Sequence, residues 1–191
     1  MSKRNARRKN KKIKFSEKDY IEKNYIVEDG KAIIPIEIKS ADDLYMKHDY
    51  KRLELSHDIC DYIEEIAYMI PINTDLVLEI HCPKLTPEQQ EKVRKTIKIN
   101  YGVEIDDIDY DINMLDKRTL ALLLFGFALL VINMLLINHL TPLVSQLLDV
   151  IWWVGIWNSV EIQLFDKNDC KWERLNYQQI YESEIVFIFD R

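Results

Sequence analysis

The first candidate for chemistry is a carboxylate in apolar surroundings, Asp149. It lies in the second of two long apolar runs, residues 119–137 and 143–162, and the first run contains Asn133. A carboxylate inside a membrane costs about 2.5–3.5 kcal/mol on insertion scales, so it needs a partner. Counted outward from the link between the runs, Asn133 and Asp149 fall at similar depths. We therefore expect Asp149 to hydrogen-bond Asn133 or a second copy of the chain, or alternatively to line an ion or proton path.

Small and polar residues accompany this pair at helical spacing. Ser145, Asp149 and Ser159 fall on one face of a helix, because steps of three and four residues connect them. In the first run Gly126 precedes Asn133 by seven residues, and a glycine there lets two helices approach closely. The predicted site for helix pairing or ion passage therefore comprises Asp149, Asn133, Ser145, Ser159 and Gly126.

Histidine and cysteine side chains form a second candidate set, for a metal ion. His57 and Cys60 are three residues apart, and His81 and Cys82 are adjacent. These ligand types suit zinc. The spacing matches no established metal motif, and adjacent residues on a strand point to opposite faces. We expect no metal and no other cofactor, with these four residues as the alternative, and reduced cysteines typical of a cytosolic compartment.

An acidic run is the third candidate. It could bind Mg²⁺ or Ca²⁺, but it lacks the ligand order of an EF-hand loop, so we expect the solvated face of a strand. The sequence also contains no glycine-rich phosphate loop and no nucleophile elbow. A non-enzymatic protein is therefore expected, with a membrane-tethered enzyme as an alternative. The run consists of Glu104, Asp106, Asp107, Asp109 and Asp111.

The two apolar runs predict a transmembrane hairpin over residues 117–165. The first run holds 19 residues, of which only Thr119 and Asn133 are polar. At about 1.5 Å per residue it spans about 28 Å, close to the thickness of a bilayer's hydrocarbon core. Thr141 and Pro142 are a favourable start for the second helix. The link of residues 138–141 is short enough to require antiparallel neighbours.

Basic residues near the runs predict the orientation of the hairpin. Lysine and arginine precede the first run and follow the second, whereas the link has neither. The positive-inside rule then places both termini in the cytoplasm of a multi-pass protein of the inner cell membrane. Tryptophan rings are expected at the membrane interface together with the basic residues before the first run. The predicted interface residues are Trp152, Trp153, Trp157, Lys117 and Arg118.

A basic arm begins the chain. The first 14 residues hold eight of the 26 Lys and Arg and no acid, which leaves 18 against 32 Asp and Glu. We expect the arm to bind anionic lipid headgroups. Nucleic acid is the less favoured partner, because the arm has no aromatic residue for base stacking. The basic residues are Lys3, Arg4, Arg7, Arg8, Lys9, Lys11, Lys12 and Lys14.

Residues outside the hairpin predict a small cytosolic α/β domain into which the hairpin is inserted. The periodicity of apolar residues, together with residues that typically begin or end helices, predicts a mixed sheet and two to three helices. Residues 107–114 also fit a helix, because Ile105, Ile108, Ile112 and Leu115 are three or four apart. The predicted strands are 31–39, 76–80 (continuing toward residue 83), 107–114 and 184–190, and the predicted helices are 56–70, 86–102 and 169–182.

The expected organisation is therefore a membrane α+β protein with four parts. A disordered basic arm (1–18) precedes the first part of the domain (19–116), the hairpin (117–165) and a closing helix and strand (166–191). The expected function is a membrane-anchored interaction or sensing module, in a specific version a switchable membrane effector. It would bind the lipid membrane and form a homo-oligomer or bind a partner membrane protein. A small channel or transport subunit using Asp149 is the alternative.

Overall fold

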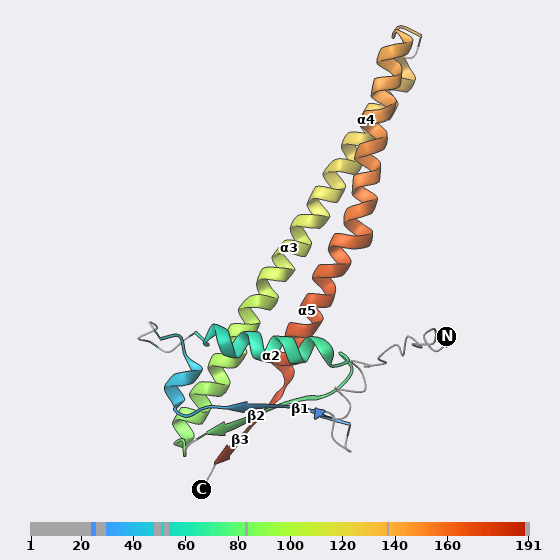
Figure 1. The fold of residues 1–191 in the computed structure, drawn as a ribbon. Coiled ribbons are helices and arrows are strands. Elements are labelled where there is room, and N and C mark those ends of the chain that lie inside the picture. Colours follow the sequence, from blue (N-terminus) through green and yellow to red (C-terminus); the bar gives the residue numbers. More distant parts are fainter. Residues whose placement is uncertain are drawn as a thin grey trace, which may run out of the picture.

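Two long helices rise from a small α/β base in the computed structural model of this chain (Figure 1). The structure describes residues 24–25, 30–47, 51, 54–82, 84–136 and 138–189. The predicted basic arm lies outside these described residues.

The base contains a sheet of three parallel strands, in the order β1 (Ala32–Glu37), β2 (Leu76–Cys82) and β3 (Glu184–Phe189). The expectation of a mixed sheet was wrong for the described residues. Both strand-to-strand connections contain helices, which return the chain to the edge from which the next strand must start. β1 is an edge strand, as Pro35 predicts, since proline has no N–H for a second neighbour.

The core lies on one face of this sheet. Side chains such as Ile34 and Leu78, which pair across β1 and β2, are fully buried. The chain passes from β1 through a 3-10 helix, η1 (Ala41–Leu44), to α2 (His57–Met69). Ile63 of α2 is also fully buried, so the apolar face predicted for this helix packs into the same core as the strands.

The second half of the expected domain differs most from the structure. A single helix, α3 (Pro87–Leu136), replaces the predicted helix, the strand at 107–114 and the first apolar run. Its start is as predicted: Gln89 N–H donates to Thr86 Oγ1 (3.3 Å) and Gln89 Oε1 accepts from Thr86 N–H (2.9 Å). Gly102 does not end the helix. Glycine weakens a helix by about 1 kcal/mol, which long flanking stretches of helix-forming residues outweigh.

The prediction of a strand at 107–114 was wrong, because the isoleucines of this segment are spaced as on one face of a helix. This spacing prevails over the alternation of apolar and polar residues. Ile108 is buried and Ile105 and Ile112 are half-buried, which places one helical face against the returning chain. α3 and α5 are in extensive contact along this stretch.

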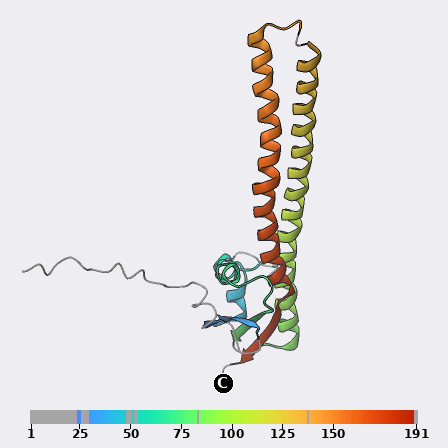
Figure 2. The same ribbon diagram turned by 90° about the vertical axis from the view of Figure 1, so that its right-hand side faces the viewer.

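The returning chain runs through three helical segments without a break. They are α4 (Pro142–Glu161), a π-helical turn η2 (Ile162–Asp166) and α5 (Lys167–Glu182), which leads to β3. Figure 2 shows the two long helices side by side over their whole length. The helix and strand predicted at 169–182 and 184–190 are thereby confirmed. By length and composition alone, α3 and the helix from Pro142 to Glu182 are both able to cross a membrane.

Candidate functional site

The structure brings Asn133 and Asp149 together near the tip of the paired helices. Asn133 Nδ2 donates to Asp149 Oδ1 (2.7 Å), and Ser145 Oγ donates to Asn133 Oδ1 (3.0 Å). Trp152 Nε1 donates to the same Asp149 oxygen (3.0 Å). Asn133 is only 5% exposed, whereas Asp149 lies at the edge of the contact and is exposed. The Asn133 side chain of α3 is therefore linked to α4 by two hydrogen bonds, one to Asp149 and one from Ser145.

Two glycines lie in the contact between α3 and α4. A Cβ on Gly126 would lie 3.1 Å from Ile156 Cγ1 and 3.1 Å from Trp152 O. A Cβ on Gly155 would lie 3.6 Å from Gly126 Cα. The sequence analysis identified Gly126 but missed Gly155, whose signal is its position four residues before Ser159 on the same helical face.

Ser159 marks the end of this contact that is nearer to the sheet. Its Oγ donates to Gly155 O (2.9 Å) and lies 3.5 Å from Thr119 O. Thr119 was also missed. Together with Gly126 and Asn133 it forms a series of small or polar residues spaced by seven, all of which are buried against α4.

The predicted interface residues do not share one level of the hairpin. Trp157 lies four residues before the end of α4, whereas Trp152 and Trp153 lie at the middle of this helix. Lys117 and Arg118 are exposed at the start of the apolar part of α3. Trp157 and the two basic residues therefore lie at the end of the apolar segment that is nearer to the base, and a role of all five residues at a membrane interface stays a prediction.

Charged residues link the helices just below the apolar part. Lys167 Nζ lies 2.5 Å from Asp116 Oδ1, to which Gln163 Nε2 also donates (3.1 Å). These hydrogen bonds, first that from Lys167, lower the pKa of Asp116. The first polar cross-link outside the apolar segment therefore lies at η2.

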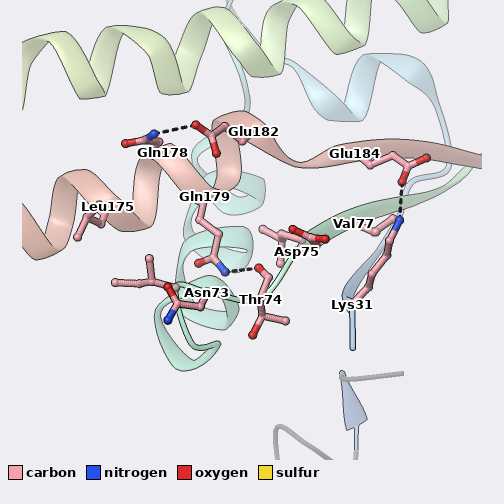
Figure 3. A pocket seen from close by; sticks show the side chains of 12 residues that line it. Lys31, Asn73, Thr74, Asp75, Val77, Leu175, Gln178, Gln179, Glu182 and Glu184 are labelled. Atoms are coloured by element: carbon pink, nitrogen blue, oxygen red, sulfur yellow. Dashed lines mark hydrogen bonds and ion pairs between the residues drawn. The ribbon is translucent and has the colours of Figure 1, made fainter. Parts of the chain in front are cut away.

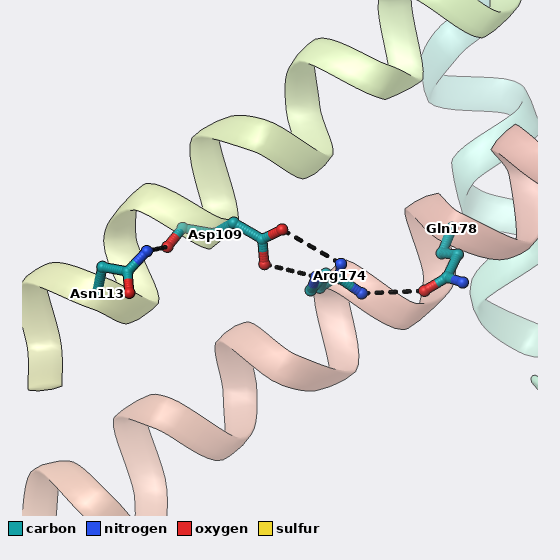
Figure 4. A network of polar contacts seen from close by, with 4 residues as sticks. All are labelled: Asp109, Asn113, Arg174 and Gln178. Carbon is teal, nitrogen blue, oxygen red and sulfur yellow. Dashed lines mark hydrogen bonds and ion pairs between the residues drawn. The ribbon is translucent and has the colours of Figure 1, made fainter.

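Figure 4 shows a second ion pair, which lies seven residues closer to the sheet on each helix, or about two turns. Arg174 donates through Nε (2.5 Å) and Nη2 (3.2 Å) to the two carboxylate oxygens of Asp109, and through Nη1 to Gln178. This bidentate bond raises the pKa of Arg174. Asp109 belongs to the acidic run, which is helical rather than a strand face. In the structure this residue joins α3 to α5.

The four candidate zinc ligands do not converge. His81 Nε2 lies 2.7 Å from Glu79 Oε1 on one face of β2, whereas Cys82 is buried on the other. His57 is exposed, and Cys60 receives a long contact from Asn100 Nδ2 (3.8 Å). No group of three or more possible metal ligands occurs among the described residues.

Cys60 lies in a negatively charged region between α2 and the long helices. It lines a cavity of about 570 Å³ together with Glu64 and Glu104. Burial, and secondarily the charge of Glu64, raises the pKa of Cys60 to about 11. Burial also raises the pKa of Glu64, while Tyr177 hydroxyl, 3.4 Å away, opposes that shift. The raised pKa favours the protonated thiol, whereas a reactive cysteine needs a lowered pKa.

A further cavity of about 470 Å³ opens at the amino ends of the strands (Figure 3). Gln178, Gln179 and Glu182 of α5 line it from one side. Gln179 is 8% exposed, and its Nε2 donates to Pro71 O (3.1 Å) and Thr74 O (2.8 Å), while its Oε1 has no hydrogen-bond partner. The sequence analysis did not identify this cavity, because its lining comes from segments about 100 residues apart.

Comparison with known proteins finds no matching family model, no matching curated protein and no matching solved structure. The functional conclusion therefore depends on the geometry described above.

Proposed function

We propose that this chain is a membrane-anchored sensing or interaction module, whose paired helices cross the inner membrane and carry the α/β base on the cytoplasmic side. The observation that carries the proposal is the continuity of α3. Its first turns bury Val93 and Ile97 in the core of the base, and its last turns expose Leu124 and Leu135 around a small, polar contact with α4. Exposed apolar side chains around a polar interior are the arrangement expected in lipid.

The positions of charged residues support this orientation. Asp116, Lys117, Arg118 and Lys167 all lie at the end of the apolar segment that faces the base. The tip, residues 138–141, has no lysine or arginine. With the base in the cytoplasm, the basic arm is on the same side as anionic headgroups, which we propose as its partner.

Sensing is favoured because the same helices contact both parts of the chain. The cavity beside Gln179 is lined by the last turns of α5, so a ligand there would touch a helix that continues through η2 into α4. The cavity lining contains three acidic residues, Asp75, Glu182 and Glu184, and one basic residue, Lys31. Lys31 Nζ lies 3.3 Å from Glu184 Oε2. This lining favours a small ligand that is positively charged or rich in hydrogen-bond donors.

Cellular fractionation and cysteine labelling test the membrane crossing. We expect the full chain to remain with membranes after carbonate washing and to need detergent for extraction. Asn138→Cys should react with an impermeant maleimide in intact spheroplasts, whereas Glu182→Cys should react only after permeabilisation. A chain that is soluble without detergent, or equal labelling at both positions, would contradict the proposal.

Ion passage is a second candidate, favoured by one observation: Asp149 is exposed within the apolar hairpin. In that case Asp149→Asn should keep the protein in the membrane and change proton or cation flux into vesicles. The two hydrogen bonds that Asp149 accepts favour a role in helix pairing instead. In that case neither the unchanged protein nor the Asp149→Asn variant should conduct protons or cations.

A further inference from the structure

One exposed face of α4 carries polar groups inside the apolar hairpin. Gln146, Asp149, Trp153 and Trp157 follow one another at steps of three, four and four residues, so they lie on one side of the helix. All four are exposed, Trp153 by 56% and Trp157 by 60%. α3 covers a different side of α4, through Gly155 and Ser159.

Several polar groups on this face have no partner within the chain. Both hydrogen bonds to Asp149 go to Oδ1. Asp149 Oδ2, the Gln146 amide and Trp153 Nε1 make no hydrogen bond among the described residues. In a membrane, polar groups without water must be satisfied by protein, so this face requires a neighbour.

We propose that this face of α4 binds a second copy of the chain; the inference rests on the proposed membrane crossing. Copies inserted in the same orientation have parallel α4 helices with equivalent residues at equal depth. Gln146 and Trp153 lie about one turn on either side of Asp149, so a donor of one copy can reach Asp149 Oδ2 of the other. Two-fold symmetry forms the same contact twice.

This face therefore carries both the hydrogen-bond acceptors and the donors that a second copy of the same face needs. Each copy offers one unsatisfied carboxylate oxygen and donors from an amide and an indole, and the tryptophan rings fill the remaining surface between the copies. Hydrogen bonds between membrane helices of this kind are an established source of helix association. A different membrane protein would need to supply its own donors at the same depth, which is an outcome that the following test distinguishes.

Disulfide cross-linking of the purified full chain, reconstituted in phosphatidylcholine and phosphatidylglycerol vesicles, tests this face. Trp157→Cys should give covalent dimers with a membrane-permeable oxidant, above the background of the three native cysteines. Leu124→Cys is the matched control, because it is equally exposed (62% against 60%) at a similar depth on α3. Cross-linking that is equal at the two positions, or absent at Trp157→Cys, overturns the inference.

Energy transfer between donor-labelled and acceptor-labelled copies in the same vesicles gives a second measurement. Gln146→Leu should weaken association by about eightfold or more, because a symmetric dimer loses this hydrogen bond twice and each bond between membrane helices contributes about threefold. Leu147→Ala, at an exposed position on the next residue of the same turn, should leave it unchanged. Insertion into vesicles without energy transfer overturns this inference alone, whereas failure to insert overturns the proposed function as well.

Discussion

The two ends of α3 bury opposite kinds of side chain. Near the sheet, α3 buries Val93, Ile97 and Tyr101. Near the tip it buries Thr119, Gly126 and Asn133, and exposes leucine and phenylalanine. The same helix thus has a large apolar contact at one end and a small polar contact at the other.

This difference is the one expected of the proposed membrane crossing, with water around one end of α3 and lipid around the other. In water, burial of apolar surface provides about 25 cal/mol per Å², so large aliphatic residues belong inside. In lipid that gain is absent, and close packing and hydrogen bonds hold helices together instead. In the proposed arrangement the boundary lies at the Asp116–Lys167 pair, the ion pair between the long helices that is nearest to the tip among the described residues.

Truncation in the core of the base should have the largest effect. Ile97→Ala removes a side chain that is only 2% exposed, and we expect a loss of about 2–4 kcal/mol in the free energy of unfolding. Leu124→Ala makes a similar truncation at a site that is 62% exposed, and unfolding in detergent should hardly change. Thermal melts in detergent compare the two variants. Equal losses of stability would argue that the hairpin buries its leucines in an apolar core, as a protein in water does.

Enlarging the glycine contact should be the next most damaging change. Gly126→Leu places atoms where Ile156 and the Trp152 carbonyl already lie, so we expect a loss of about 1–3 kcal/mol in SDS-induced unfolding from mild micelles. Gly102→Ala is the control, since its Cβ would meet Tyr181 at an ordinary 3.5 Å. That variant should be neutral or stabilising by up to about 1 kcal/mol. Similar tolerance at both glycines would show that the hairpin helices are not in close contact.

Removing the polar contact at the tip should have a smaller effect. Asn133→Leu deletes the donor to Asp149 and the acceptor for Ser145 Oγ, with an expected loss of about 0.6–1.7 kcal/mol in the same assay. Asn113→Leu, where the amide bonds only its own helix at Asp109 O, should change stability less. A gain in stability for Asn133→Leu would mean that the buried amide serves a purpose other than helix pairing.

Neutralising Glu64 should have the smallest effect, with a defined pH dependence. Because burial raises its pKa in the folded state, ionised Glu64 opposes folding at neutral pH, and this penalty disappears as pH falls through the raised pKa. Glu64→Gln should therefore melt about 1–2 °C higher at pH 7 and show no advantage near pH 4. A difference in melting temperature that grows toward low pH would contradict the expected direction of this effect.

The sequence predicted the elements whose signals are local and strong. The Thr86 and Gln89 capping pair, the apolar run that contains Asn133 and the strand beginning at Glu184 all occur as expected. The depth argument also anticipated that Asn133 and Asp149 would meet, because a four-residue link leaves little freedom in the register of two helices. The roles of these residues in pairing or ion passage remain predictions.

The errors occurred where a local rule competed with packing at a distance. Gly102 resembles a helix terminus, and alternation near Ile108 resembles a strand, but the contact with α5 favours one uninterrupted helix. The parallel direction of all strands could not be read from single segments, since it depends on where each helix returns the chain. The cavity beside Gln179 was missed for the same reason, because Lys31 and Glu184 come together only in the folded base.

The π-helical turn η2 changes the direction in which the side chains that follow it point around the helix axis. Its wider winding accommodates an additional residue in the helix, which rotates every later side chain about the axis relative to an uninterrupted α-helix. Successive residues of an α-helix differ by about 100°, so the same sequence wound as an uninterrupted α-helix would turn Arg174 and Gln179 away from Asp109 and Thr74. The five residues of η2 thus set the direction in which every side chain of α5 points around the helix axis.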